Sequence, residues 1–313
     1  MVTRGKNIFL KRLDDAIIFS KLPRFTRLTR RPLFTLSRAL VFRLFSLIGG
    51  RRAISVRGKT FWGAPMELSI PDGDTIFQCS FFNFDAEIKL TRFFIKNLKP
   101  DDVFFDIGSY FGFYSLLAAN FIDKPGSIHA FEPTPRTFSV LEKNCRSYNV
   151  IRSNQLALWD NNGEIEFYDL GPLFSVCNTY SPNMDDEAFE ADVRATKRKI
   201  SVRASTIDAY VDLNKVGKVD VMKVDVERSE PFVLRGARET IMKFRPIISV
   251  EILGTRWGAS DDETISLLKS YGYGLFILNA DGDPIPFDEK TPKQFIHENL
   301  VAIHPSNSII RKK

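Results

Sequence analysis

The chain has 313 residues, of which 44% are hydrophobic, so it is long enough to bury one sizeable core and carry a smaller appendage. Its three cysteines, Cys79, Cys145 and Cys177, are far apart and odd in number, which argues against a disulfide framework. The three histidines show no metal-ligand spacing. We therefore expect a reducing, cytoplasmic compartment and no metal site.

The net charge of +6 is unevenly distributed. Residues 1–57 hold 14 Lys and Arg against 2 acids, a net charge of +12, which leaves −6 for the remainder. A domain of that slightly acidic kind is not typical of a nucleic-acid binder, so we expect no nucleic-acid partner. The basic N-terminal arm, in contrast, suits an anionic surface.

Within the arm, residues 33–48 are apolar apart from interruptions such as Arg38 and Arg43. The stretch is too short and too broken for a membrane-spanning helix, and it predicts an amphipathic one. Two interpretations stay open. In one, the arginines meet lipid phosphates while Phe34, Phe42 and Phe45 enter the interface, giving peripheral contact with the inner face of a membrane. In the other, the helix packs on its own domain.

Residues 58–98 form a lead-in segment that we expect to pack on the core. Residues 66–70 are strand-like, and residues 87–96 space Ile88 and Phe94 as a helix does. That helix leads into the first strand of the main domain, residues 99–313.

From residue 99 onward, strands and helices alternate, which is typical of a doubly wound, mostly parallel α/β sheet. The first strand, 103–106, ends in Asp106 and runs into a tight turn that holds Gly108, Tyr110 and Gly112. An acid that ends a strand, followed by glycines that let the backbone approach a ligand, suits a nucleoside cofactor with a positive charge.

The second strand, 127–132, ends in Glu132, which lies 26 residues after Asp106. This offset is close to the roughly 20 residues at which such folds place a carboxylate for ribose hydroxyls. We therefore assign Glu132 to a ribose.

Residues 154–159 predict a third strand, and the turn signal at 160–163 predicts a hairpin with 164–168 as its second arm. Residues 171–199 show little periodicity and pair an acidic piece with a basic one. They suit either a substrate-facing lid or a solvated surface loop.

The fourth strand is expected at 219–227, and it would place Lys223, Asp225 and Glu227 on one face, although central strands normally read almost wholly apolar. The fifth strand also ends in an acid, Glu251. Because open α/β sheets bind ligands at the carboxyl ends of their strands, these groups predict a polar cleft.

The C-terminal part predicts a helix at 261–271, a strand near 275–279 and a last strand at 299–303. With the turn signal at 281–284 between them, we expect the two strands to close the chain as a hairpin.

Six segments in this order resemble the FkbM family of S-adenosylmethionine-dependent methyltransferases, over about residues 85–303. The segments are 106–112, 131–133, 157–163, 206–208, 222–227 and 245–251. The resemblance implies a seven-stranded, Rossmann-like sheet whose last strand is antiparallel. It also implies S-adenosylmethionine as cofactor and, as acceptor, a hydroxyl of a small molecule such as a natural product, or of a glycan or glycolipid. The family usually has Asn where this chain has Tyr110, and Gly where it has Arg228.

On this resemblance, Asp106, Gly108 and Gly112 would cradle the methionine part of the cofactor, and Tyr110 would narrow the pocket or stack on it. The border of the adenine would run from Ala157 to Asp160.

The acceptor side is assigned from position at the strand ends. Asp225 is expected to orient or deprotonate the acceptor hydroxyl, with Glu227 and Glu251 as further candidates. Lys223 is expected to tune these acids.

Two other function classes stay open. A nicotinamide-dependent oxidoreductase uses the same kind of sheet, but the turn from Gly108 to Gly112 lacks the spacing Gly-x-Gly-x-x-Gly. A noncatalytic membrane-surface or glycan-binding module with a degenerate methyltransferase fold would follow if Tyr110 blocked the pocket. The sequence does not indicate an oligomeric state.

Overall fold

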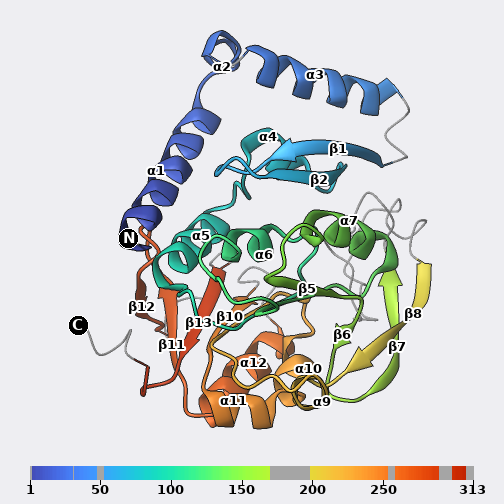
Figure 1. Cartoon of the computed structure of the whole chain (residues 1–313), viewed down its shortest axis with the longest axis vertical. Coiled ribbons are helices and arrows are strands. Elements are labelled where there is room, and N and C mark those ends of the chain that lie inside the picture. The colour runs from blue at the N-terminus through green and yellow to red at the C-terminus, as the bar shows by residue number, and fades with distance from the viewer. Residues whose placement is uncertain are drawn as a thin grey trace.

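The structure is a computed structural model. It describes residues 2–30, 32–47, 53–169, 198–252, 258–288 and 298–307 (Figure 1). The predicted lid or loop, apart from its last two residues, lies outside the described residues.

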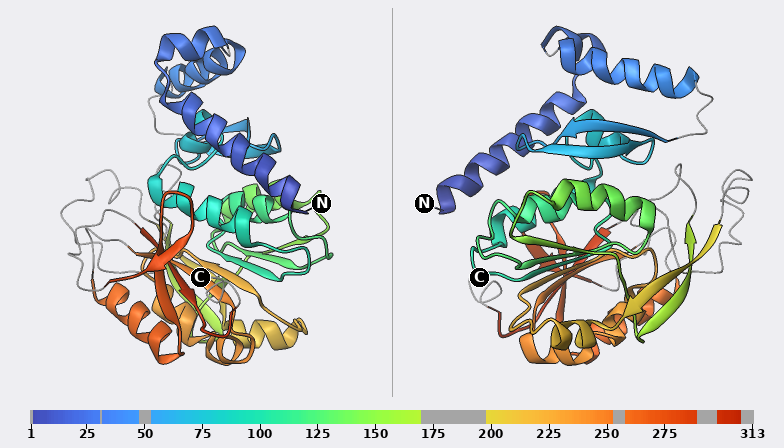
Figure 2. Two further views of the ribbon diagram at one scale, coloured as in Figure 1. Left: turned by 90° about the vertical axis from the view of Figure 1, so that its left-hand side faces the viewer. Right: turned by 45° about the vertical axis from the view of Figure 1, so that its right-hand side comes forward.

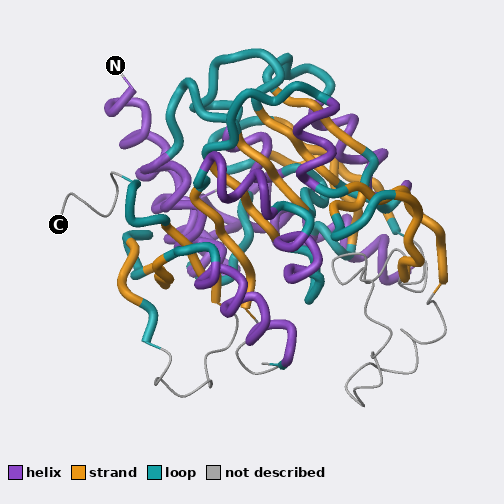
Figure 3. Tube along the Cα trace, turned by 90° about the horizontal axis from the view of Figure 1, so that it is seen from below, coloured by secondary structure: helices purple, strands orange, loops and turns teal. Residues whose placement is uncertain are grey.

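An eight-stranded sheet forms the middle layer, in the order β12-β11-β13-β10-β9-β3-β4-β5. Its strands are β3 (Phe104–Ile107), β4 (Ile128–Phe131), β5 (Ile151–Asn154), β9 (Val221–Val224), β10 (Ile247–Ile252), β11 (Gly274–Leu278), β12 (Pro284–Pro286) and β13 (Glu298–Ile303). The pairs from β5 to β10 are parallel, and β13 is antiparallel to both β10 and β11. Figure 3 follows these strands side by side through the middle of the molecule.

The mostly parallel α/β sheet and its antiparallel last strand are as predicted, but the predicted count of seven strands is wrong. The eighth strand is β12, which pairs antiparallel with β11. The turn at 281–284 therefore connects β11 to β12, and β13 reaches β11 from the other side. A short turn signal identifies a hairpin but not which later segment completes it.

A second sheet of three strands lies beside the first, in the order β6-β8-β7. Its strands are β6 (Ala157–Leu158), β7 (Gly163–Asp169) and β8 (Arg198–Ser205). The predicted hairpin at 154–168 is wrong, because β8 lies between its two arms, parallel to β6 and antiparallel to β7. The alternating side chains of β7 and β8, such as Phe167 and Val202, bury one face of this sheet.

Helices cover both faces of the main sheet (Figure 2). One layer holds α5 (Asp85–Asn97), α6 (Phe113–Ala118) and α7 (Pro135–Cys145), and the other holds α9 (Ile207–Leu213), α10 (Glu230–Arg235), α11 (Arg238–Phe244) and α12 (Ala259–Ser270). Successive residues of β3 face opposite layers, since Phe104 and Phe105 belong to two different hydrophobic clusters. Both are fully buried, so the centre of the sheet is apolar on both faces up to its carboxyl edge.

The N-terminal arm consists of α1 (Val2–Lys21), α2 (Arg24–Arg30) and α3 (Pro32–Leu47), followed by the hairpin of β1 (Ile54–Lys59) and β2 (Pro65–Ile70) and by α4 (Asp74–Cys79). Helix α1 is fastened to the core: Leu13 is fully buried, and Lys6 Nζ donates to the carbonyl oxygens of Lys96 and Leu98 at 2.9 and 2.6 Å. Asp14 forms an ion pair with Arg92 of α5. In the part of the chain described, no helix is long and apolar enough to cross a membrane.

The end of α10 packs closely against the backbone that follows β6. A substitution at this contact tests the arrangement of the two sheets and helices described above. A Cβ atom on Gly236 would lie 1.9 Å from the Trp159 carbonyl oxygen, although φ at Gly236 is an ordinary −72°. We predict that Gly236→Ala lowers the free energy of unfolding by roughly 1–3 kcal/mol, because the backbone at Trp159, directly after β6, must move. Urea denaturation followed by circular dichroism measures this.

Gly217→Ala is the matched control, since a Cβ there meets nothing within 4 Å. Its free energy of unfolding should stay within about 0.5 kcal/mol of the original. Equal stability of the two variants would contradict the packing described here.

Candidate active site

The turn between β3 and α6 passes very close to the end of β9. Gly108 has φ of 75°, and a Cβ atom there would lie 1.8 Å from the Asp225 carbonyl oxygen, so only glycine fits. The turn is also fixed to the end of β4, because the backbone N–H groups of Gly108 and Ser109 donate to the Phe131 carbonyl oxygen at 3.1 and 2.9 Å. Three strand ends therefore meet at this turn.

Two more residues of the turn have left-handed backbones, Tyr110 with φ of 53° and Gly112 with φ of 88°. A Cβ on Gly112 would lie 2.7 Å from Leu141 Cδ1, so this glycine lets α7 pack closely. The ring of Tyr110 stacks on Phe111 with 3.8 Å between ring centroids. Asn, which the family usually has at this position, visits the left-handed region readily, so Tyr110 keeps a backbone that suits Asn better.

A cavity opens at the carboxyl ends of β3, β4 and β9. Of the predicted site residues, its wall includes Gly108, Tyr110, Glu132, Ala157, Asp225, Glu227 and Glu251. The wall does not include Asp106 of β3, Gly112 of the turn that follows it, or Asp160. The structure therefore brings together the predicted ribose ligand and all three acids assigned to the acceptor.

Glu132 follows β4 directly and is only 7% exposed. Its Oε1 atom accepts from the Thr134 backbone N–H at 2.9 Å, and the Tyr110 backbone also hydrogen-bonds to this carboxylate. Burial raises the pKa of Glu132 to about 7, against these stabilising hydrogen bonds. The Thr134 side chain makes a third hydrogen bond to this carboxylate. A carboxylate has about four lone-pair sites, so capacity remains for one ligand hydroxyl.

The segment from Leu156 to Trp159 supplies an apolar part of the wall. The Trp159 ring is stacked on Phe232, with 4.1 Å between centroids and 11° between planes. Asp160, in contrast, is bound to Arg235 at 3.3 Å. Of the predicted border from Ala157 to Asp160, the first three residues line the cavity and Asp160 does not.

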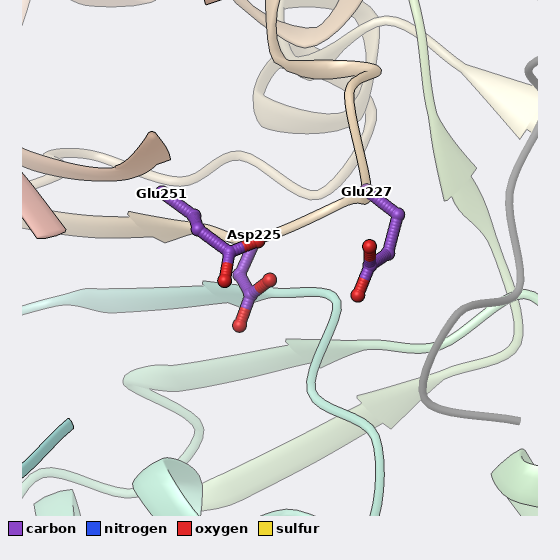
Figure 4. Close-up of side chains that lie close together, drawn as sticks. All are labelled: Asp225, Glu227 and Glu251. Atoms are coloured by element: carbon purple, nitrogen blue, oxygen red, sulfur yellow. The ribbon is translucent and has the colours of Figure 1, made fainter. Parts of the chain in front are cut away.

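Asp225, Glu227 and Glu251 place a carboxylate oxygen each within 4.8 Å of one another, and Figure 4 shows the three groups pointing into the same space. The prediction that Glu227 shares a strand face is wrong, because β9 ends at Val224. Glu227 and Arg228 have φ of 52° and 71°, so a left-handed turn after β9 places Glu227 beside the other two acids. Arg228 thus adopts the backbone region that glycine, usual in the family here, occupies most easily.

This trio is a set of oxygen ligands of the kind that hard divalent cations prefer. The sequence predicted no metal site, and it contained no spacing signal for one, because the three acids come from a turn and a neighbouring strand. One of the three, Asp225, already binds an ammonium group.

That ammonium belongs to Lys223, which is 3% exposed and lies 2.7 Å from Asp225 Oδ2. Burial opposes its charge, but the carboxylates of Asp225, Asp106 and Glu87 raise the pKa of Lys223 above its usual value. Asp106 is buried behind the cavity wall, where its Oδ2 accepts from Ser115 Oγ at 2.6 Å. Burial raises the pKa of Asp106, and the charge of Lys223 opposes that rise.

Glu87, which no strand-end pattern in the sequence indicates, lines the cavity from the first turn of α5. Its carboxylate accepts from Tyr114 Oη at 2.7 Å and from Asn299 Nδ2 at 2.9 Å. Phe82 and Phe84 of the same lead-in segment also line the cavity. An acid in a first helical turn is ordinary, so the sequence carried no signal for this role.

The cavity can therefore hold a ligand with three distinct parts. Glu132 suits a ligand hydroxyl, the segment from Leu156 to Trp159 suits a flat apolar ring, and the acid trio suits a positive charge.

Comparison with known proteins agrees with this geometry. The family model described as the methyltransferase FkbM domain matches residues 106–275. The chain is similar to the 31-O-demethyl-FK506 methyltransferase FkbM of Streptomyces tacrolimicus, with 27% identity over 224 residues that cover 64% of this chain and 83% of the relative. It is similar to the hexuronic acid methyltransferase AglP of Haloferax volcanii, with 26% identity over 201 residues that cover 63% of this chain and 75% of the relative.

Among solved structures, the methyltransferase FkbM from Methylobacillus flagellatus KT is similar, with 15% identity and a TM-score of 0.42 over 73% of this chain. The chain spans about half of that protein, 52%, and a TM-score this low carries no argument. The assignment rests on the family model instead. Because that model matches more than half of the residues of this chain, the chain belongs to the FkbM methyltransferase domain family.

Proposed function

We propose that this methyltransferase moves a methyl group from S-adenosylmethionine to a hydroxyl of a glycan, a glycolipid or a natural product. The observation that carries the proposal is the single cavity that Glu132 shares with the acids Asp225, Glu227 and Glu251. The acceptor class is supported by two relatives, which are named for methylating a hexuronic acid and 31-O-demethyl-FK506. Family membership also favours this function over the nicotinamide-dependent oxidoreductase.

The residues present fit the proposed cofactor. Glu132 would accept a hydrogen bond from a ribose hydroxyl, and Leu158 with Trp159 would border the adenine. The turn at Gly108 and Tyr110 would bound the methionine part, near the negative charge of the acid trio. When bound, the cofactor supplies an electrophilic methyl group on a sulfonium ion.

The chain's own task is to position the acceptor and take its proton. As the acceptor hydroxyl takes up the methyl group that the cofactor would supply, its proton would pass to a carboxylate of the chain. Asp225 suits this role, because it lines the cavity and is held by Lys223. Glu227 and Glu251 lie within reach of the same space.

The first test is cofactor binding, measured by calorimetry with S-adenosylmethionine. We predict that Glu132→Gln weakens binding roughly 10–100-fold, since charged hydrogen bonds to the ribose are lost. Asp212→Asn, an exposed acid on α9, should bind as the original protein does. No binding by the folded original protein would reject the methyltransferase proposal and favour a noncatalytic module.

A pH series sharpens this test. With a pKa of about 7, Glu132 loses its charge as the pH falls, so affinity for S-adenosylmethionine should drop about tenfold between about pH 8 and pH 6. Glu132→Gln cannot titrate, so its weaker binding should be flat over this range. A slope that survives in Glu132→Gln would assign the pH dependence to another group.

The acceptor side is tested by turnover. We predict that Asp225→Asn keeps its affinity for S-adenosylmethionine within a few-fold but slows methyl transfer about 100-fold or more, because the carboxylate assigned to take the acceptor's proton is lost. Transfer of radiolabelled methyl to a panel of uronic-acid saccharides and hydroxylated macrolides measures this. Normal turnover in Asp225→Asn, with loss in Glu227→Gln or Glu251→Gln, would move the base to that residue.

A further inference from the structure

Helix α3 has an inward face that packs on its own domain. The Arg38 guanidinium lies 3.1 Å from the centroid of the Phe34 ring and 4.8 Å from that of Phe77 in α4. Val41 and Phe45 continue this face and pack against the main hydrophobic cluster. The interpretation in which the helix packs on its own domain is therefore correct for this face.

The opposite face of α3 is also apolar, and it is exposed. Leu36, Leu40 and Leu44 are 55%, 58% and 48% exposed. Their spacing of four residues aligns them in one stripe along the helix. Phe25 of α2, at 76% exposed, adds an aromatic ring to the exposed surface of the arm. Both helices lie at the end of the molecule, beyond the hairpin of β1 and β2 (Figure 1).

Exposed cations accompany this stripe. Lys21, Arg30 and Arg43 lie on α1, α2 and α3 with their side chains in solvent. Residues 1–57 carry a net charge of +12, while the rest of the chain carries −6. An apolar stripe among basic residues is the pattern of a helix that lies in the headgroup region of a bilayer.

We propose that α2 and α3 dock on an anionic lipid bilayer. Leu36, Leu40 and Leu44 insert at the boundary between headgroups and acyl chains, and Arg30 and Arg43 meet lipid phosphates. A bilayer fits better than a second copy of this surface, because two arms of the same strong positive charge repel each other. The inward face stays on the protein, so docking requires no unfolding of α3.

Vesicle co-sedimentation tests the proposal. The full chain should sediment with vesicles that contain phosphatidylserine, and less with phosphatidylcholine alone or at high salt. The triple variant Leu36→Gln, Leu40→Gln and Leu44→Gln should bind at least about tenfold more weakly, because three apolar side chains no longer enter the lipid. Gln preserves helix propensity, so circular dichroism should be unchanged.

The matched control replaces exposed apolar residues outside the arm, as Leu213→Gln and Met242→Gln, at 83% and 50% exposed. It should sediment as the original protein does. Equal sedimentation of the arm variant and the original, or no lipid binding by the original, would overturn the proposal. So would a dimer in lipid-free buffer that the arm variant converts to a monomer, because the stripe would then join two copies.

Discussion

The buried ammonium group of Lys223 is the constraint on which the site depends. A charge that is 3% exposed is tolerated only when opposite charges and hydrogen bonds surround it. Asp225 provides the direct partner at 2.7 Å, and Asp106 and Glu87 add two more carboxylates. These acids come from the end of β9, from β3 and from α5, so one cation fixes the two central strands and the lead-in segment relative to one another.

The parts of the site that the sequence predicted are those that a local pattern specifies. A buried strand, a turn with Gly108 and an acid at the next strand end follow each other within a short stretch, so both the turn and Glu132 could be placed. Charged and apolar residues alternate from Lys223 to Glu227, as they do in a strand. No glycine marks the left-handed turn, so the sequence did not show where the strand ends. The position of β8 and the role of Glu87 depend on contacts between distant segments, which local periodicity does not encode.

Two departures from the family's usual residues share one physical property. Tyr110 and Arg228 both have positive φ, at 53° and 71°, in places where the family usually has Asn and Gly. Such a backbone is costly for a large side chain, by about 1–3 kcal/mol in strained cases. Both turns nevertheless have a left-handed backbone, and Tyr110 at the first of them lines the cavity.

The contacts of Glu87 show that the site extends beyond the segment that the family model matches. Its carboxylate is held by Asn299, and neither residue lies in the segment 106–275 that the family model matches. A fragment cut at those limits would keep the turn at Gly108 but would lose α5, β13 and one of the three carboxylates around Lys223. The environment of this buried charge therefore extends beyond the segment that defines the family on both sides.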